Sequence, residues 1–117
     1  MQTEYISNNT EAPVIVLFGG NPLRREEVIK QLKQIGDISI YGTLSEEEGL
    51  AKIKSLTKVD LVLIGGRYAD EQRIKIRKFV AEHLPSAKIS EPGVYFPYET
   101  QAINNDVMFK IGLQIHK

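Results

Sequence analysis

Two short apolar runs in this chain end in the same way, and they constrain its fold more than any other feature. The first is Val14–Phe18, which is apolar at every position and is followed by Gly19-Gly20. The second covers residues 59–64, is apolar except for Asp60, and is followed by Gly65-Gly66. Short runs that are rich in β-branched residues and lack polar alternation are typical of strands covered on both faces. The pattern predicts two central strands of a parallel sheet.

The segments that follow these runs have the features of helices. Asn21 is expected to be an N-cap and Pro22 a first helical residue, with Gly36 closing the helix. Residues 45–48, Ser-Glu-Glu-Glu, predict a capping box for a second helix, and Asp70 is the expected cap of a third. The predicted core face of the third helix is Ile74, Ile76, Phe79, Val80 and Leu84, and its predicted solvent face carries Arg73, Lys75, Arg77 and Lys78.

Two weaker strands are predicted at residues 37–41 and 87–90, and their lower apolar content places them at the edges of the sheet. The C-terminal segment has two readings. Apolar residues recur at helical spacing, which favours a helix over residues 99–112 capped by Gly112. The alternative is a fifth strand over residues 107–115, because apolar residues also alternate there.

This order of elements predicts an α/β fold of three layers, with helices on both faces of a wholly parallel sheet. Right-handed crossovers and the buried first and third strands give the strand order 2-1-3-4. At 117 residues the chain fits one domain, which we place at residues 13–117. Residues 1–12 form a polar N-terminal tail by composition, with Tyr5 and Ile6 as its expected anchors.

In such sheets a ligand binds beyond the carboxyl ends of the strands, where the winding reverses. Here that point lies between the two strands that end in Gly-Gly. The residues expected to converge there are Gly19, Gly20, Asn21, Gly65, Gly66, Arg67 and Tyr68.

Two readings of the glycine pairs stay open. In the functional one, backbone N–H groups approach an anion at a helix N-terminus, and Arg24, Arg25 or Arg67 adds positive charge. In the structural one, the glycines permit a tight turn from strand to helix. Neither pair belongs to a G-x-G-x-x-G or Walker motif, so the sequence does not predict a dinucleotide cofactor.

The length, the element order and the expected core over about residues 13–112 resemble the receiver domains of response regulators, within the flavodoxin-like class. Receivers carry an acidic pair after the first strand, where this chain has Phe18-Gly19-Gly20. They carry a phosphoaccepting aspartate after the third strand, where this chain has Gly65-Gly66, and Asp60 lies at the opposite end of that strand. The resemblance therefore implies the fold of a receiver without its phosphorylation chemistry.

Aromatic residues gather in the segment before the C-terminal helix. Tyr95, Phe96 and Tyr98 follow the last predicted strand and are candidates for an interaction surface. The alternative is that Tyr95 and Phe96 pack beneath the C-terminal helix as part of the core.

No residue stands out as catalytic or as a metal ligand. The chain has no cysteine and two histidines, and their spacing does not match a metal site. His83 lies near the end of the third helix, where balancing the helix dipole is its expected role. We therefore predict no catalytic residue, no metal site and no cofactor.

The 15 basic and 15 acidic residues cancel, which argues against nucleic-acid binding through phosphate contacts. No apolar run approaches the roughly 20 residues of a membrane span, and the N-terminus lacks the pattern of a signal peptide, so a cytoplasmic protein is expected. These features favour a non-catalytic regulatory or signalling module that binds a protein partner or forms a homodimer. The alternative is a small-ligand binder that takes a phosphate or nucleotide at the two Gly-Gly loops.

Overall fold

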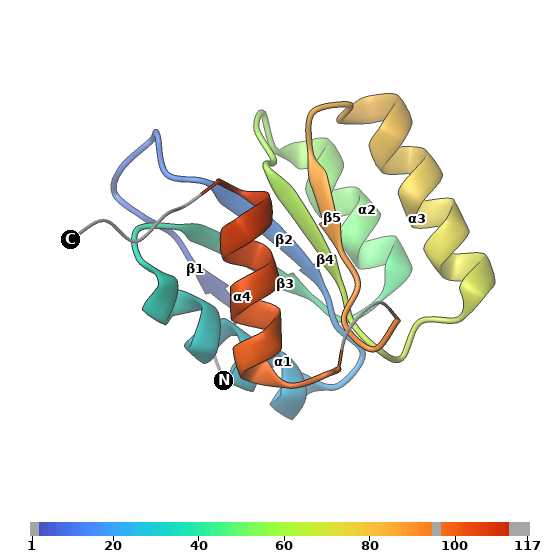
Figure 1. Cartoon of the computed structure of the whole chain (residues 1–117). Helices are drawn as coiled ribbons and strands as arrows, with labels where there is room; N and C mark the ends of the chain where they lie inside the picture. The colour runs from blue at the N-terminus through green and yellow to red at the C-terminus, as the bar shows by residue number, and fades with distance from the viewer. Residues whose placement is uncertain (1–2, 95–96, 113–117) are drawn as a thin grey trace.

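The computed structural model describes residues 3–94 and 97–112, which form a five-stranded sheet with four α-helices (Figure 1). In chain order the elements are β1 (Glu4–Tyr5), β2 (Val14–Phe18), α1 (Pro22–Leu32), a 3₁₀ turn (Lys33–Ile35), β3 (Ser39–Thr43), α2 (Glu46–Ser55), β4 (Leu61–Ile64), α3 (Asp70–His83), β5 (Lys88–Ser90) and α4 (Thr100–Lys110). None of the helices in these two ranges is both long and apolar enough to cross a bilayer.

The sheet has the order β1-β3-β2-β4-β5. The four expected strands, β2 to β5, pair parallel with one another and keep the expected relative order. However, β1 pairs antiparallel with β3 through Glu4–Tyr41 and Tyr5–Ile40. The sheet is therefore mixed, its complete order differs from the expected one, and the prediction of a wholly parallel sheet was wrong.

Within the predicted tail, the described residues from Thr3 to Ser7 contact the sheet. Tyr5 packs against the core, whereas the other expected anchor, Ile6, is 56% exposed. The amide of Gly42 donates to the carbonyl of Thr3 at 2.8 Å, and the Ser7 amide donates to Ser39 Oγ at 3.0 Å. This segment satisfies the edge of β3, which would otherwise expose unpaired backbone groups.

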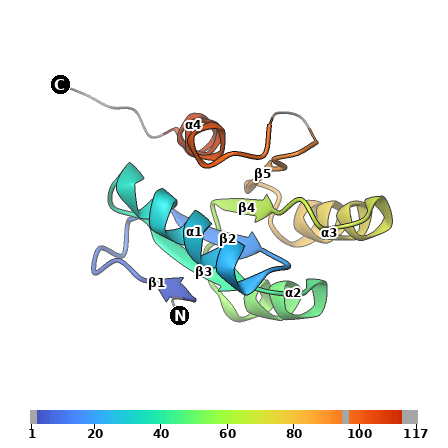
Figure 2. The ribbon, with the colours of Figure 1, turned by 90° about the horizontal axis from the view of Figure 1, so that it is seen from below.

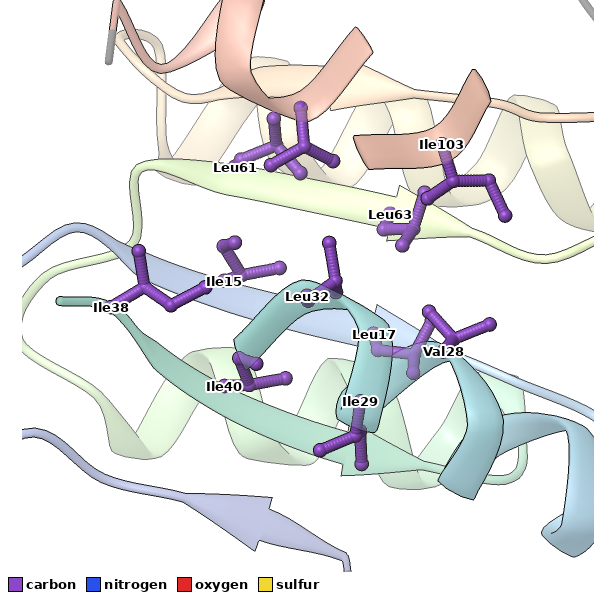
Figure 3. Close-up of a cluster of buried hydrophobic side chains, with 11 residues drawn as sticks. Ile15, Leu17, Val28, Ile29, Leu32, Ile38, Ile40, Leu61, Leu63 and Ile103 are labelled. Atoms are coloured by element: carbon purple, nitrogen blue, oxygen red, sulfur yellow. The ribbon is translucent and has the colours of Figure 1, made fainter. Parts of the chain in front are cut away.

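Helices cover both faces of the sheet, so the predicted three layers are present (Figure 2). One core cluster joins α1 and α4 to the sheet, and Figure 3 shows how its side chains meet. The other cluster joins α2 and α3 to the opposite face. Successive residues of β2 alternate between the clusters: Ile15 and Leu17 face α1, and Val16 and Phe18 face α2 and α3.

The buried face of α3 differs from the predicted one. Ile76 and Val80 are buried as expected, but Ile74 is 59% exposed and Arg73, expected on the solvent side, is 3% exposed. Residues 73, 76 and 80 share one face of a helix because their spacing is three and then four. The prediction followed apolar character at position 74, whereas the helix register buries the arginine instead.

Helix α4 covers Thr100–Lys110, so the fifth-strand alternative was wrong for the described part of residues 107–115, of which residues 113–115 lie outside the described ranges. Ile103 and Val107 are buried and Phe109 is 82% exposed, which is helical spacing. Gly112 follows the cap residue with φ +71°, as a helix-ending glycine does.

The helix starts confirm two of three predicted caps. The Asn21 side chain accepts from the amides of Leu23 and Arg24, and Ser45 accepts from the amide of Glu48. At the third helix the cap position is Ala69, and Asp70 is already helical. Because alanine has no polar side chain, the cap residue of α3 offers no acceptor to the first helical amides. The amide of Ala69 itself donates to the Gln72 side chain at 2.9 Å.

Candidate functional site

A cleft of about 480 Å³ lies at the carboxyl ends of β2 and β4. Six of the seven residues expected to converge at this point line it: Gly19, Gly20, Asn21, Gly65, Gly66 and Arg67. Its other walls come from α1, which contributes Leu23, Arg24, Arg25, Glu27 and Val28, and from Leu17 and Tyr98. The strand order brings these segments together, since β2 and β4 are neighbours in the sheet.

The seventh expected residue, Tyr68, is buried on the far side of the turn. Its ring packs edge-on against Phe18, with ring centroids 6.1 Å apart, and its hydroxyl donates to the carbonyl of Gly19 at 2.9 Å. Burial raises the Tyr68 pKa to about 12, with smaller contributions from the charges of Glu48 and Glu46. Tyr68 thus ties the turn after β4 to the turn after β2 and does not line the cleft.

The glycines at the two turns are needed for space and not for an unusual backbone angle, because none of the four has a positive φ. A methyl group on Gly65 would lie 2.9 Å from the carbonyl oxygen of Phe18, and one on Gly66 would lie 3.1 Å from the Tyr98 ring. A methyl group on Gly20 would meet only the aliphatic carbons of Arg67, the nearest at 3.1 Å. Close packing at the sheet edge therefore explains the Gly-Gly pairs.

Most backbone amides that were expected to face an anion already have acceptors. The Asn21 side chain occupies the first amides of α1, Pro22 has no N–H, Gly19 donates to Thr43, and Gly65 donates to Phe18. The amides of Gly20, Asn21 and Gly66 donate to no other described residue. An anion in the cleft would therefore meet few free amides.

Three arginines line the cleft, and their environments differ. Arg24 forms a 2.6 Å ion pair with Glu27 and lies over the ring of Tyr98, 4.7 Å from its centroid. Arg67 is exposed and forms no ion pair or side-chain hydrogen bond with the described residues. The sequence predicted Arg67 as a member of the site and Arg24 only as a nearby charge.

Arg25 is the unusual member of this group. It is only 7% exposed, and its Nε atom is buried without a hydrogen-bond acceptor. It forms no ion pair with the described residues. Its side chain extends along the end of the sheet, where methyl groups placed on Gly19 and Gly42 would lie 3.5 Å from its Cβ and 3.0 Å from its Cδ. Sequence reasoning missed this burial because β3 must supply Gly42 for the arginine to pack there.

A buried ion network holds the turn after β4. Arg73 donates to the carbonyls of Gly65 and Tyr68 at 2.6 and 3.0 Å, and to Glu91 at 2.9 Å. Arg77 forms two hydrogen bonds to the same carboxylate, at 2.6 and 2.9 Å. Burial opposes the ionisation of Glu91, but the bonds from Arg77 and Arg73 outweigh it, so its pKa is lower than its ordinary value. The cleft therefore has one rigidly supported wall.

The remaining candidates have structural surroundings or lie outside the described ranges. Tyr95 and Phe96 are outside them, whereas Tyr98 packs over Gly66 and lines the cleft. His83 stacks on Phe79 near the end of α3, and its Nδ1 lies 3.1 Å from the Phe79 carbonyl. At the far end of β4 from the cleft, Asp60 accepts from the Val14 amide at 2.8 Å. Within residues 3–94 and 97–112, no cluster of acidic or histidine side chains is arranged to hold a metal ion.

A second hollow of about 340 Å³ adjoins the cleft. Gly20 and Arg67 line both, and the second hollow also contacts Ser45, Glu46 and Gln72. These polar groups already have partners: Ser45 accepts from Glu48, Glu46 pairs with Lys75 at 2.8 Å, and Gln72 accepts from Ala69. The second hollow is therefore the weaker candidate for a ligand.

Comparisons of this chain with protein-family models, with curated proteins and with solved structures each found no match.

Proposed function

We propose that this domain is a binding module for a small anionic ligand. The ligand would be held by a phosphate or similar group in the cleft at the carboxyl ends of β2 and β4. The observation that carries the proposal is Arg25, a cation at the cleft that is more than nine-tenths buried and lacks an acceptor for Nε. Burying a charged group without a partner is costly, and native proteins normally supply one. No described acidic side chain pairs with the Arg25 guanidinium, and an anion bound in the cleft would supply that counter-charge.

The other charges at the cleft support the same ligand class. Its lining carries three arginines against one glutamate, and that glutamate is paired with Arg24. Arg25 and Arg67 are therefore left to act on a ligand. Arginine suits this role because its planar guanidinium forms paired hydrogen bonds with phosphate and carboxylate.

Isothermal titration calorimetry with inorganic phosphate and with pyrophosphate tests the proposal. We expect binding by the native protein and at least tenfold weaker binding by Arg25→Met, since a hydrogen bond to a charged group contributes about 1.5–3 kcal/mol. Replacing a buried, unpaired charge by an apolar chain of similar length should leave the folding free energy unchanged or raise it. A loss of binding therefore cannot be attributed to unfolding if the variant is equally stable.

Lys78→Met is the matched control, because Lys78 is an exposed cation on α3 that is not part of the cleft lining. It should bind as the native protein does. The proposal fails if neither anion binds the native protein, or if Arg25→Met and Lys78→Met bind equally well.

A protein-interaction module is the second candidate, and exposed apolar side chains favour it. Phe109 on α4 and Ile74 on α3 are 82% and 59% exposed. A receiver-like domain that lacks the phosphoaccepting aspartate would act through such surfaces. Sedimentation equilibrium tests the self-associating form: a concentration-dependent dimer that Phe109→Ser abolishes would support it, and a monomer at all concentrations would contradict it.

A further inference from the structure

Part of the cleft lining is apolar. Leu17, Leu23, Val28 and Tyr98 line the same space as Arg25 and Arg67. Leu23 is 67% exposed although it lies in the first turn of α1, beside an otherwise well-packed core. Its exposed side chain is part of the cleft wall, so a ligand in the cleft would cover it.

The volume of the cleft fits a ligand larger than a bare anion. About 480 Å³ lies in the range of roughly 300–1,000 Å³ that is typical of sites for small organic molecules. An inorganic phosphate would occupy a small part of this space and would leave Leu23 in contact with water.

We infer that the ligand is an organic monophosphate with an apolar body, whose phosphate lies at Arg25 and Arg67 and whose apolar part covers Leu23 beside Tyr98. This inference rests on the proposed anion-binding function and adds the chemical class of the ligand. The ring of Tyr98 is held in place for this contact, because it packs over Gly66 and lies beneath the guanidinium of Arg24.

The affinities of three phosphates test the inference: phenyl phosphate, ribose 5-phosphate and inorganic phosphate, each measured by calorimetry on the native protein. The first two carry the same phosphate on bodies of opposite polarity. We expect phenyl phosphate to bind at least tenfold more tightly than ribose 5-phosphate. At about 25 cal/mol per Å² of apolar surface, a tenfold gain corresponds to roughly 60 Å² of buried surface, which is less than one aromatic ring offers.

Leu23→Ser shows whether the apolar wall is responsible. It should reduce the preference for phenyl phosphate at least threefold and leave the affinity for ribose 5-phosphate unchanged. Ile74→Ser is the matched control, because Ile74 is exposed to a similar extent, at 59%, on a helix that does not line the cleft. It should change neither affinity.

The outcomes separate this inference from the function on which it rests. If none of the three phosphates binds, the proposed anion site itself is wrong. If all three bind with equal affinity, or if Leu23→Ser keeps the full preference, the anion site stands and the apolar ligand class is overturned.

Discussion

The turn after β2 and the turn after β4 carry the same glycine pair, yet they are held in different ways. After β2, which ends at Phe18, helix α1 begins at Pro22, and the Asn21 side chain supplies the cap. After β4, helix α3 begins only at Asp70. The Arg73 side chain holds this longer turn by donating to the carbonyls of Gly65 and Tyr68. Near the first turn, Arg25 has no acceptor for Nε, whereas the second turn is supported by Arg73, which is ion-paired with Glu91.

This difference shows which structural property a Gly-Gly pair after a buried strand indicates. In both turns it marks close packing, which is tightest at Gly65, where a Cβ atom would lie 2.9 Å from the carbonyl oxygen of Phe18, and looser at Gly20, where the nearest atoms belong to the exposed side chain of Arg67. It does not by itself make an anion site, because capping occupies the amides at one turn and Tyr98 covers the glycines at the other. Under the proposed function, the arginines beside the turns would supply the charge that the glycine loops lack.

The largest loss of stability is expected when the ion network that supports the turn after β4 loses the carboxylate of Glu91. Glu91→Gln leaves Arg73, which is buried, without the charge that neutralises it. Breaking a buried pair in this way costs about 3–5 kcal/mol. Urea unfolding measures the loss, and Glu82→Gln, an exposed change on α3, should stay within about 0.5 kcal/mol of the native protein. A loss below about 1 kcal/mol for Glu91→Gln would show that the network does not support the turn.

The same carboxyl group gives a dependence on pH. Because the Glu91 pKa is lower in the folded state than its ordinary value of 4.5, its contribution to stability is complete above that value and is lost as the pH falls below it. Unfolding measured from pH 6 to pH 3 should show a steeper loss for the native protein than for Glu91→Gln. Parallel curves would contradict this assignment.

The two glycine pairs should respond unequally to a single methyl group. Gly65→Ala forces the new Cβ to within 2.9 Å of a backbone oxygen that cannot move without displacing β2, so a loss of about 1–3 kcal/mol is expected. Gly20→Ala meets only the side chain of Arg67, which is exposed and can shift, so a loss below about 1 kcal/mol is expected. Thermal unfolding of both variants measures the two losses of stability. Equal losses would contradict the expected difference between the two glycine pairs.

Tyr68→Phe removes the hydrogen bond that joins the turns and should cost about 1 kcal/mol. The raised pKa adds a spectroscopic check. Since burial keeps Tyr68 protonated until about pH 12, its contribution is present below the ordinary value of 10.0 and lost above it. In an ultraviolet titration, one of the five tyrosines of the chain should ionise late, and Tyr68→Phe should remove that phase. A late phase that persists in the variant would belong to another tyrosine.

The smallest expected changes in stability come from substitutions at the cap residues of α1 and α3. Asn21→Ala should destabilise the protein by about 1 kcal/mol, because the amides of Leu23 and Arg24 lose their acceptor. Ala69→Ser should stabilise it by about 0.5 kcal/mol, because the cap of α3 has extended φ and ψ but no side-chain acceptor. Chemical unfolding measures both changes, and effects of the same sign would contradict the assigned difference between the caps.

Local patterns in the sequence were sufficient for much of the fold. Apolar runs identified β2 and β4, and the pair Asn21-Pro22 identified the start of α1. Strand β1 was not predicted because a two-residue strand is too short to show an alternating pattern of apolar and polar residues. Its pairing depends on the edge of β3, which lies far away in the sequence. Tertiary context, and not local pattern, places it.

The sequence predicted that the two glycine turns meet, but it did not predict the surroundings of the arginines beside them. Topology alone placed Gly19, Gly20, Gly65 and Gly66 around one cleft. The burial of Arg25 and Arg73 could not be predicted, because it depends on helix register and on acceptors or gaps supplied by distant segments, such as Glu91 and Gly42. An arginine looks the same in the sequence whether it is solvated, paired or without an acceptor.

The most direct test of the anion site follows the Nε–H signals of the arginines in ¹H–¹⁵N spectra during titration with phenyl phosphate. The Nε atom of Arg25 is buried, but it shares the charge of the guanidinium that a bound anion would contact. We expect the Arg25 signal, assigned by its absence in Arg25→Met, to shift in a saturable manner together with the amides of Gly20 and Gly66. An Arg25 signal that stays fixed while phenyl phosphate shifts only exposed arginines would contradict the account.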